Sequence, residues 1–370
     1  MKKDSYIPGI DMAKLLVMFF IASAHVLHYG LKPVAGDLHP ILRPFTYDFL
    51  YTLFASMNVF AIATGFLSVK ASCRYSKLIP LYLQLVFTGL VVSLVLKATG
   101  LVEITLSDLS AVFRPFACNH WWYMTCYLPV ALLAPFLNEG IKALPRRALE
   151  TFLVLALGII TTLDFVTKEG VNVVMRGYST EWLLVLYVLG AYLRLYNPLA
   201  HLRARTCFLG VILIALVSAS IPALAPNLPF GAAIVRYLHL FDLTSPNILA
   251  LGLLTFTGFV NLRVENARVI KVVRFLAPAT LGVYLIHVQP YLWYRLLRPA
   301  LEETHLASVW ALPFVCLALG AVIFVVCLAL DLLRVQLFKV LRVGEICESL
   351  SARLAARIFK APTQNADTNP

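Results

Sequence analysis

Long apolar runs recur throughout this chain of 370 residues, and each is long enough to cross a lipid bilayer as a helix. Crossing the hydrocarbon core takes about 20 predominantly apolar residues. The mean hydropathy is +0.82 and only 14% of the residues are charged, against about 25% in a soluble domain. The sequence therefore excludes a disordered chain, a coiled coil and a soluble nucleic-acid-binding module, and predicts an all-α polytopic membrane helical bundle. We predict about ten transmembrane helices, at residues 9–29, 46–68, 78–97, 121–138, 150–167, 180–197, 206–225, 240–260, 277–296 and 308–332.

The basic residues indicate how this bundle is oriented. The chain carries 31 Lys and Arg against 19 Asp and Glu, which gives a formal net charge of +12. Most of these bases fall in short loops on the side of the N-terminus, and cytoplasmic loops of membrane proteins collect Lys and Arg. We therefore predict that both termini are cytoplasmic and that the protein spans the cell (inner or plasma) membrane many times. Because the basic excess follows topology, we expect membrane lipid and no nucleic acid as a partner.

The domain organisation follows from where the apolar runs end. We predict one transmembrane domain over 1–344 and a cytoplasmic tail over 345–370, which begins as a basic amphipathic stretch on the membrane surface and ends disordered. No signal-peptide cleavage site follows the first apolar run, so we take that run as the first transmembrane helix. The seven cysteines form no CxxC pair and no spacing typical of a zinc site, so we expect no metal.

The first span carries three ionisable side chains, and such a group at membrane depth is a functional candidate because burying it in lipid costs several kcal/mol. At 100° per residue, Asp11, Lys14 and His25 fall on one helix face about 60° wide. His25 lies about 16 Å beyond Lys14 along the axis, and about 21 Å from Asp11. A structural alternative for the first two is an i,i+3 ion pair at a helix end, with the ammonium group of Lys14 reaching the interface.

This pattern, an Asp, a basic residue, ten further residues and a His, resembles the opening helix of the acyltransferase-3 family of polytopic membrane O-acyltransferases. That family usually has Arg where this chain has Lys14, and the change keeps the charge but loses the two-pronged guanidinium. Four further blocks resemble family segments in the same order: VFAIATGFLS (Val59 to Ser68), RYSKLIPLY (Arg74 to Tyr82), HWWYMTCYLPVALLAPFLN (His120 to Asn138) and LGVYLIHVQPYLW (Leu281 to Trp293).

The resemblance implies transfer of an acyl group, usually acetyl, from cytoplasmic acetyl-CoA to a hydroxyl of a glycan or lipid-linked sugar. Lys14, Arg74 and Lys77 are bases at the predicted cytoplasmic mouth, where they suit the phosphates of an acyl-CoA. Imidazole has a pKa near neutral pH, so we assign His25 as the general base that deprotonates the acceptor hydroxyl. A covalent acyl-imidazole relay is the open alternative. Asp11 is too far from His25 to orient it, and we expect it to hold Lys14 or a neighbouring helix.

Several polar and aromatic groups at the predicted outer side could bind the acceptor or stabilise an oxyanion. The candidates are Arg114, Trp122, Tyr123, Arg236, Asp242 and His287. Each has a structural alternative: the aromatic residues could form an interfacial belt, the arginines could be loop charges, the carboxylate an ion pair and the imidazole an interhelical hydrogen bond.

Two other classes of function compete with an enzyme. A transporter or flippase for a glycolipid or small molecule would also use many spans and buried charge, but we see no repeat between the two halves of the chain. A scaffold would have no reason to bear ionisable groups at membrane depth. The identity of the acceptor, and acetyl against another acyl group such as succinyl, stay open from the sequence alone.

Overall fold

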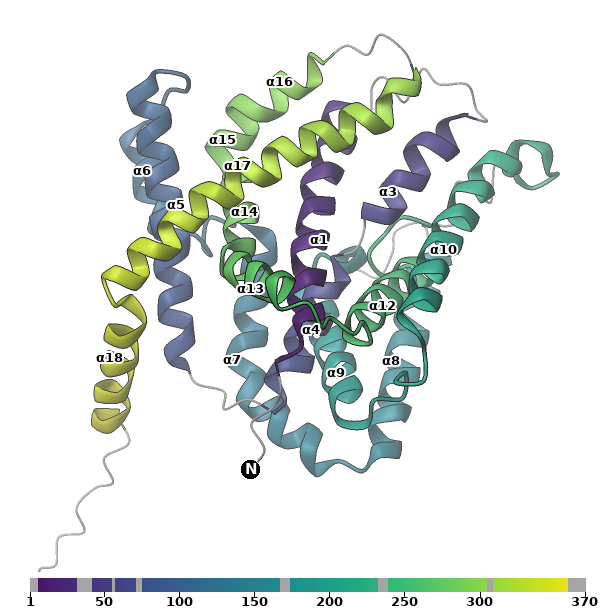
Figure 1. The fold of residues 1–370 in the computed structure, drawn as a ribbon, viewed down its shortest axis with the longest axis horizontal. Coiled ribbons are helices and arrows are strands. Elements are labelled where there is room, and N and C mark those ends of the chain that lie inside the picture. Colours follow the sequence, from purple (N-terminus) through teal and green to yellow (C-terminus); the bar gives the residue numbers. More distant parts are fainter. Residues whose placement is uncertain are drawn as a thin grey trace, which may run out of the picture.

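The computed structural model is a bundle of helices, and the parts of the chain that it describes contain no β-strand (Figure 1). α1 (Pro8–His25) runs through the middle, with α14 (Thr280–His287) on one side and α3 (Phe49–Phe54) and α12 (Pro246–Val260) on the other. The predicted all-α fold is therefore confirmed. The described residues are 6–31, 42–54, 57–70, 75–166, 174–231, 239–304 and 309–358.

Seven helical stretches within the described residues are long and apolar enough to cross a membrane. They are Pro8–Gly30, Pro44–Ser68, Tyr75–Thr99, Trp122–Ala143, Ala204–Asn227, Ala267–His287 and Leu312–Val340. The other three predicted spans coincide with α8 (Arg146–Val166), α9 (Thr180–Tyr196) and α12, which are shorter or less apolar. Most side chains of α9 are buried against other helices, so few of them would contact lipid. Every predicted span thus contains helix, while the number ten stays a prediction.

α1 and α17 (Leu312–Val340) pack against each other in opposite directions. The Sγ atom of Cys316 lies 3.4 Å from the carbonyl oxygen of Ser23, and the rings of Phe19 and Phe324 lie 5.9 Å apart further along. The start of α1 and the end of α17 therefore lie at the same end of the bundle, which we call the inner end. The opposite end, toward His25, is the outer end. That the inner end faces the cytoplasm stays a prediction.

Close backbone contact joins α4 (Asn58–Ser68) to α9. A Cβ atom added at Gly65 would overlap the carbonyl oxygen of Tyr187, and one added at Gly190 would overlap that of Ile62. Small residues allow such close approach, which is how helices in lipid gain van der Waals contact. The buried amide of Asn58 adds a polar link at 3.1 Å, because it accepts a hydrogen bond from the indole of Trp182.

The predicted span 277–296 is not one continuous helix. α14 ends at His287, and a new helix, α15 (Pro290–Leu292), begins after a break. Pro290 has no backbone N–H to continue the helical ladder, and the Gln289 side chain accepts a hydrogen bond from the Leu292 N–H at 2.9 Å. The break places His287 at a helix end inside the bundle instead of midway along a helix.

The chain ends in a further helix, α18 (Val343–Ile358), which covers the first part of the predicted tail. It packs against α5 (Leu78–Thr99) and the short turn Tyr75–Lys77. The polar end of the tail, which we predict to be disordered, lies outside the described residues, as does everything after residue 358.

Candidate active site

One face of α1, continued by the π-helical turn Val26–Gly30, lines two cavities. Lys14, Met18, Ile21, His25 and His28 follow one another at intervals of three or four residues, which is the spacing of a single helix face. The first three line an inner cavity of about 370 Å³, and the last three line an outer cavity of about 100 Å³. The predicted polar face of the first helix thus turns into the bundle, where its charged end and its imidazole end open into different cavities.

The inner cavity combines two lysines with an aromatic wall. Lys14 comes from α1 and Lys77 from the turn before α5, and the wall includes Tyr123, Tyr127 and Tyr284. The Lys14 ammonium lies 3.1 Å from the Asp11 carboxylate, so the predicted i,i+3 ion pair is present. Asp11 also accepts a hydrogen bond from the Tyr6 hydroxyl at 2.9 Å. Arg74, the third predicted base of this group, lies outside the described residues.

The outer cavity is lined chiefly by rings. His25, at the end of α1, and His28, in the π-helical turn Val26–Gly30 that follows, share it with Tyr29, Tyr51 and Tyr178, as well as Phe241. The rings of His25 and Tyr29 stack at 6.0 Å between centroids. Each tyrosine presents an apolar ring and a polar hydroxyl. This wall therefore suits a ligand that has both apolar faces and hydroxyl groups, and it would hold that ligand beside the imidazole.

His287 contacts His25 directly. Its Nε2 atom lies 3.1 Å from Nδ1 of His25, and its Nδ1 atom lies 2.6 Å from the carbonyl oxygen of Val283. Its side chain is fully buried, and the ring of Trp293 lies 5.3 Å from the ring of His25. The sequence analysis placed His287 with the acceptor-binding groups, whereas the structure places it against the predicted base. Pro290, three residues later, was the available sign of a helix end there.

Asp242 has partners that sequence reasoning missed. Its carboxylate lies 2.8 Å from a guanidinium nitrogen of Arg176, and the ring of His239 lies 3.6 Å away. The ion-pair alternative for Asp242 is therefore the observed one. The cluster adjoins the outer cavity, because Tyr178 and Phe241, which line that cavity, neighbour Arg176 and Asp242 in sequence. Arg236, another predicted acceptor group, lies outside the described residues.

The remaining predicted acceptor groups separate in the structure. The ring of Trp122 packs on that of Tyr178 at 4.6 Å, which keeps it beside the outer cavity. Tyr123 instead lines the inner cavity. Arg114 is exposed in the turn after α6 (Leu106–Val112) and lines neither cavity. Arg114, Trp122 and Tyr123 are close in sequence, but their side chains lie in three different environments.

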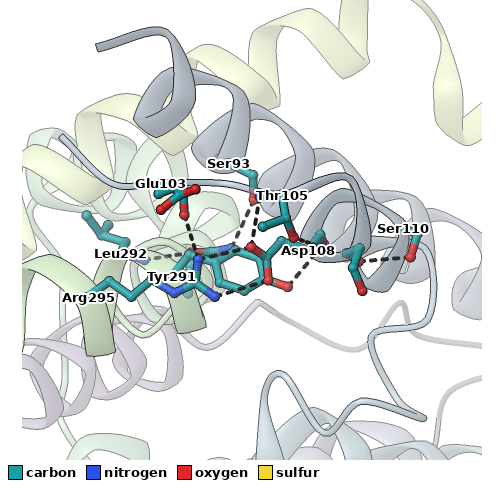
Figure 2. Close-up of polar contacts among 10 residues, drawn as sticks. Ser93, Glu103, Thr105, Asp108, Ser110, Tyr291, Leu292 and Arg295 are labelled. Atoms are coloured by element: carbon teal, nitrogen blue, oxygen red, sulfur yellow. Dashed lines mark hydrogen bonds and ion pairs between the residues drawn. The ribbon is translucent and has the colours of Figure 1, made fainter. Parts of the chain in front are cut away.

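A polar latch outside both cavities joins α6 to the segment after the helix break (Figure 2). Arg295 pairs with both carboxylate oxygens of Asp108, at 3.0 and 3.1 Å, and it also donates to the Glu103 carbonyl oxygen. Asp108 and Thr105 cap α6 reciprocally, and the Tyr291 hydroxyl donates to the Asp108 carbonyl oxygen at 3.0 Å. Hydrogen bonds from Arg295 lower the pKa of the Asp108 carboxyl to about 2. The latch therefore fixes the segment that follows His287.

Three π-helical segments lie at or beside the outer cavity. Val26–Gly30 directly follows His25, Trp293–Leu297 begins at the ring that contacts His25, and Pro44–Asp48 contains Tyr47. The Tyr47 hydroxyl lies 3.2 Å from Nδ1 of His28. π-helical turns occur often at functional sites, where they re-aim side chains. Their gathering here marks the outer cavity as a candidate site independently of His25.

The polar side chains that line the two cavities are cations, hydroxyl groups and imidazoles. Across the described parts of the chain, no group of three His, Cys, Asp or Glu side chains is arranged to hold a metal ion. The inner cavity offers cations to an anionic ligand, and the outer cavity offers a buried imidazole to a hydroxyl group.

Comparison with known proteins identifies the chain. The family model described as an acyltransferase domain matches residues 7–332, which cover α1 to most of α17. No curated protein and no solved structure matches the chain. The matched region contains all of the helices that build the two cavities. The chain therefore belongs to the acyltransferase-3 family and is a multi-pass membrane acyltransferase.

Proposed function

We propose that the protein transfers an acetyl or other short acyl group from cytoplasmic acyl-CoA to a hydroxyl of a cell-surface glycan or lipid-linked sugar, with His25 as the general base. The observation that carries this proposal is the continuous face of α1. It leads from Lys14 in the inner cavity to His25 in the outer cavity, about 16 Å further along the axis. A donor from one side of the membrane and an acceptor on the other would meet along this face.

The inner cavity suits the donor. Lys14 and Lys77 supply positive charge for the phosphates of an acyl-CoA, and Arg74 stands three residues before Lys77 in the sequence. The apolar and aromatic wall suits the uncharged arm that carries the thioester. A volume of about 370 Å³ lies within the range of roughly 300–1,000 Å³ that is usual for ligand pockets. In this proposal the donor enters at the inner end, with its thioester directed toward His25.

The reaction proceeds at His25. The acceptor hydroxyl oxygen attacks the carbonyl carbon of the thioester while its proton passes to the imidazole. The carbon–sulfur bond then breaks, the acceptor keeps the acyl group as an ester, and the coenzyme leaves as a thiol that takes the proton back from the imidazolium. A covalent relay would instead place the acyl group on His25 before the acceptor binds.

The outer cavity suits a sugar. The tyrosines at 29, 51 and 178 offer ring faces to the apolar face of a pyranose and hydroxyl groups to its rim. The Arg176 and Asp242 pair, beside the cavity, offers charged hydrogen-bonding groups to further hydroxyls. These groups support a glycan or lipid-linked sugar as the acceptor class.

The experiment measures label transfer by the purified full-length protein in lipid vesicles. Wild type should move radiolabel from acetyl-CoA to added lipid-linked oligosaccharide. His25→Ala should lower this rate by about 10²–10⁴-fold, as expected for loss of a general base. His201→Ala, in an exposed turn far from both cavities in sequence, is the matched control. Wild-type turnover by His25→Ala would remove the imidazole from the mechanism.

The same vesicles distinguish the two alternatives. A flippase would expose the lipid-linked sugar on the opposite leaflet without acetyl-CoA, and would leave the sugar unlabelled. A covalent relay would leave label on the protein when acetyl-CoA is added without acceptor, whereas general-base catalysis leaves none. Each outcome is read from the same gel and lipid extract.

A further inference from the structure

We propose that His287 is a positioning residue that fixes the proton of His25 on Nδ1 and so leaves Nε2 of His25 unprotonated for the acceptor hydroxyl. The inference deepens the proposed function, because it concerns the state of the proposed base. It rests on two short contacts of one fully buried imidazole.

The first contact decides where His287 carries its own proton. Nδ1 of His287 lies 2.6 Å from the carbonyl oxygen of Val283, one turn earlier in α14. A carbonyl oxygen can only accept a hydrogen bond, so Nδ1 must carry the hydrogen. Every protonation state of His287 that keeps this contact therefore has a proton on Nδ1.

The environment of His287 favours its neutral form. The side chain is 0% exposed, and none of the ion pairs among the described residues involves it or His25. A buried imidazolium without a carboxylate partner is costly, so the ring is held neutral. With its single proton on Nδ1, the Nε2 atom of His287 presents a bare lone pair.

The second contact determines which nitrogen of His25 carries the proton. Nε2 of His287 lies 3.1 Å from Nδ1 of His25, a distance at which one of the two atoms donates. Because Nε2 of His287 has no hydrogen, Nδ1 of His25 is the donor. Neutral His25 then has its lone pair on Nε2, which is the only ring atom left to accept a proton from a hydroxyl.

The arrangement has the logic of a catalytic base oriented by a third group. A hydrogen bond on one ring nitrogen selects the tautomer and the ring orientation, and the other nitrogen does the chemistry. When His25 takes the proton of the acceptor, its Nδ1–H becomes the donor of a charged group, and the bond to His287 strengthens. His287 therefore acts on the reaction through His25 without touching the substrate.

The helix break holds His287 in this position. α14 ends at His287, and Gln289 caps the next helix at 2.9 Å from the Leu292 N–H. Trp293, one turn further, packs its ring within 5.3 Å of His25 and 6.4 Å of His287. The two imidazoles therefore meet where the end of α1 packs against the helix break.

A spectroscopic experiment tests the tautomer without any assay of transfer. Full-length protein with ¹⁵N-labelled histidine is studied in lipid by solid-state NMR, with His25→Gln used to assign the signal of His25. The proposal predicts that wild-type His25 is protonated at Nδ1, and that His287→Leu shows a larger share of the Nε2-protonated tautomer, although the Ile21 backbone stays as a second partner of the ring. A wild-type His25 protonated at Nε2 would overturn the proposal, as would an unchanged single tautomer in His287→Leu.

Kinetics then separate positioning from mere structure. His287→Leu, which cannot accept a hydrogen bond, should lower kcat more than tenfold with an unchanged KM for the donor. His287→Gln can accept through its side-chain oxygen, and should recover most of the lost kcat. Equal losses in both variants would overturn the positioning role. If His25→Ala kept full activity, the proposed general base would fall while the NMR result on the tautomer would still stand.

Discussion

The two cavities along α1 differ in size and in chemistry although one helix face lines both. The inner cavity holds about 370 Å³ and two lysines, while the outer holds about 100 Å³ and two histidines among tyrosines. Fixed cations bind phosphate groups by charge. An imidazole in a small aromatic cavity can act as a base only on a reacting group that the cavity holds within hydrogen-bond distance. Under the proposed function, this difference would assign donor binding to the inner cavity and the chemical step to the outer one.

The largest effect should come from removing the imidazole. His25→Ala should abolish nearly all transfer, by about 10²–10⁴-fold in kcat, and leave the affinity for free CoA unchanged. Turnover is measured by label transfer and affinity by calorimetry on the same preparation. A parallel loss of CoA affinity would break the comparison, since it would mean that the two cavities bind the donor as one site.

The converse change concerns the inner cavity. Lys77→Ala should raise the KM for acyl-CoA by about 10–100-fold with little change in kcat, as expected for a lost hydrogen bond to a charged group worth about 1.5–3 kcal/mol. Thioesters of dephospho-CoA, which lack the 3′-phosphate, identify the phosphate that Lys77 contacts. If it is the 3′-phosphate, the KM values of the variant and the wild type should differ less with these thioesters. A fall in kcat at saturating donor, with KM unchanged, would contradict a binding role.

Met57 tests the boundary between the cavities. Ile21 and Met57 line both, so an acyl group that travels from one to the other passes these two side chains. Met57→Ala should widen the passage and raise the rate with hexanoyl-CoA relative to acetyl-CoA by about tenfold, in line with about 1–3 kcal/mol of discrimination per methylene in a closed apolar pocket. Leu132→Ala, on the exposed face of α7 (Trp122–Ala143), is the control. An unchanged ratio would place the passage elsewhere.

Local patterns in the sequence predicted the polar face of α1 but not the contacts between residues far apart in the chain. The face shared by Asp11, Lys14 and His25 follows from the geometry of one helix, so counting residues was enough to predict it. The pair of His25 and His287 joins residues 262 positions apart, and Arg295 and Asp108 are 187 apart. Nothing in a single sequence measures such distances, because they depend on how helices pack.

Helix interruptions account for the other misses. Pro290 signalled a break, but the hydrophobic pattern around it continued and favoured one span over 277–296. Arg176 adopts a left-handed backbone with φ of 55°, a conformation that ordinary residue preferences do not predict. Its partner, Asp242, was flagged as a carboxylate that needs a counterion, and only the fold could supply one.

The smallest expected effect lies outside both cavities, at the latch between Asp108 and Arg295. Asp108→Asn should lower the unfolding free energy by about 1 kcal/mol, since it weakens a helix cap and a part-exposed ion pair. Because the folded pKa of Asp108 is lowered to about 2, against roughly 3.9 unfolded, its stabilisation is present above pH 4 and is lost as the pH falls toward 2. Apparent Tm in detergent should therefore converge for wild type and variant in acid.

The matched control for the latch is Glu302→Gln. Glu302 pairs with Arg298 on an exposed helix face at 2.8 Å, and an ion pair that solvent screens this fully adds little to stability. Its Tm should stay near that of wild type from neutral to acid pH. A shift as large as that of Asp108→Asn would show that any lost surface pair has the same effect, and the latch would have no special part in holding the segment after His287.

The π-helical turns at Val26–Gly30, Pro44–Asp48 and Trp293–Leu297 each contain one residue more than a regular turn of the same helix would need. Deleting that extra residue restores a regular helix locally, so the change falls on the side chains of the turn itself, such as His28, Tyr29 and Tyr47. Variation in chain length by single residues at these three points would re-aim side chains at and beside the outer cavity while the helices on either side keep their places. Natural or engineered changes in acceptor preference should accordingly be sought first as single-residue indels, not as substitutions.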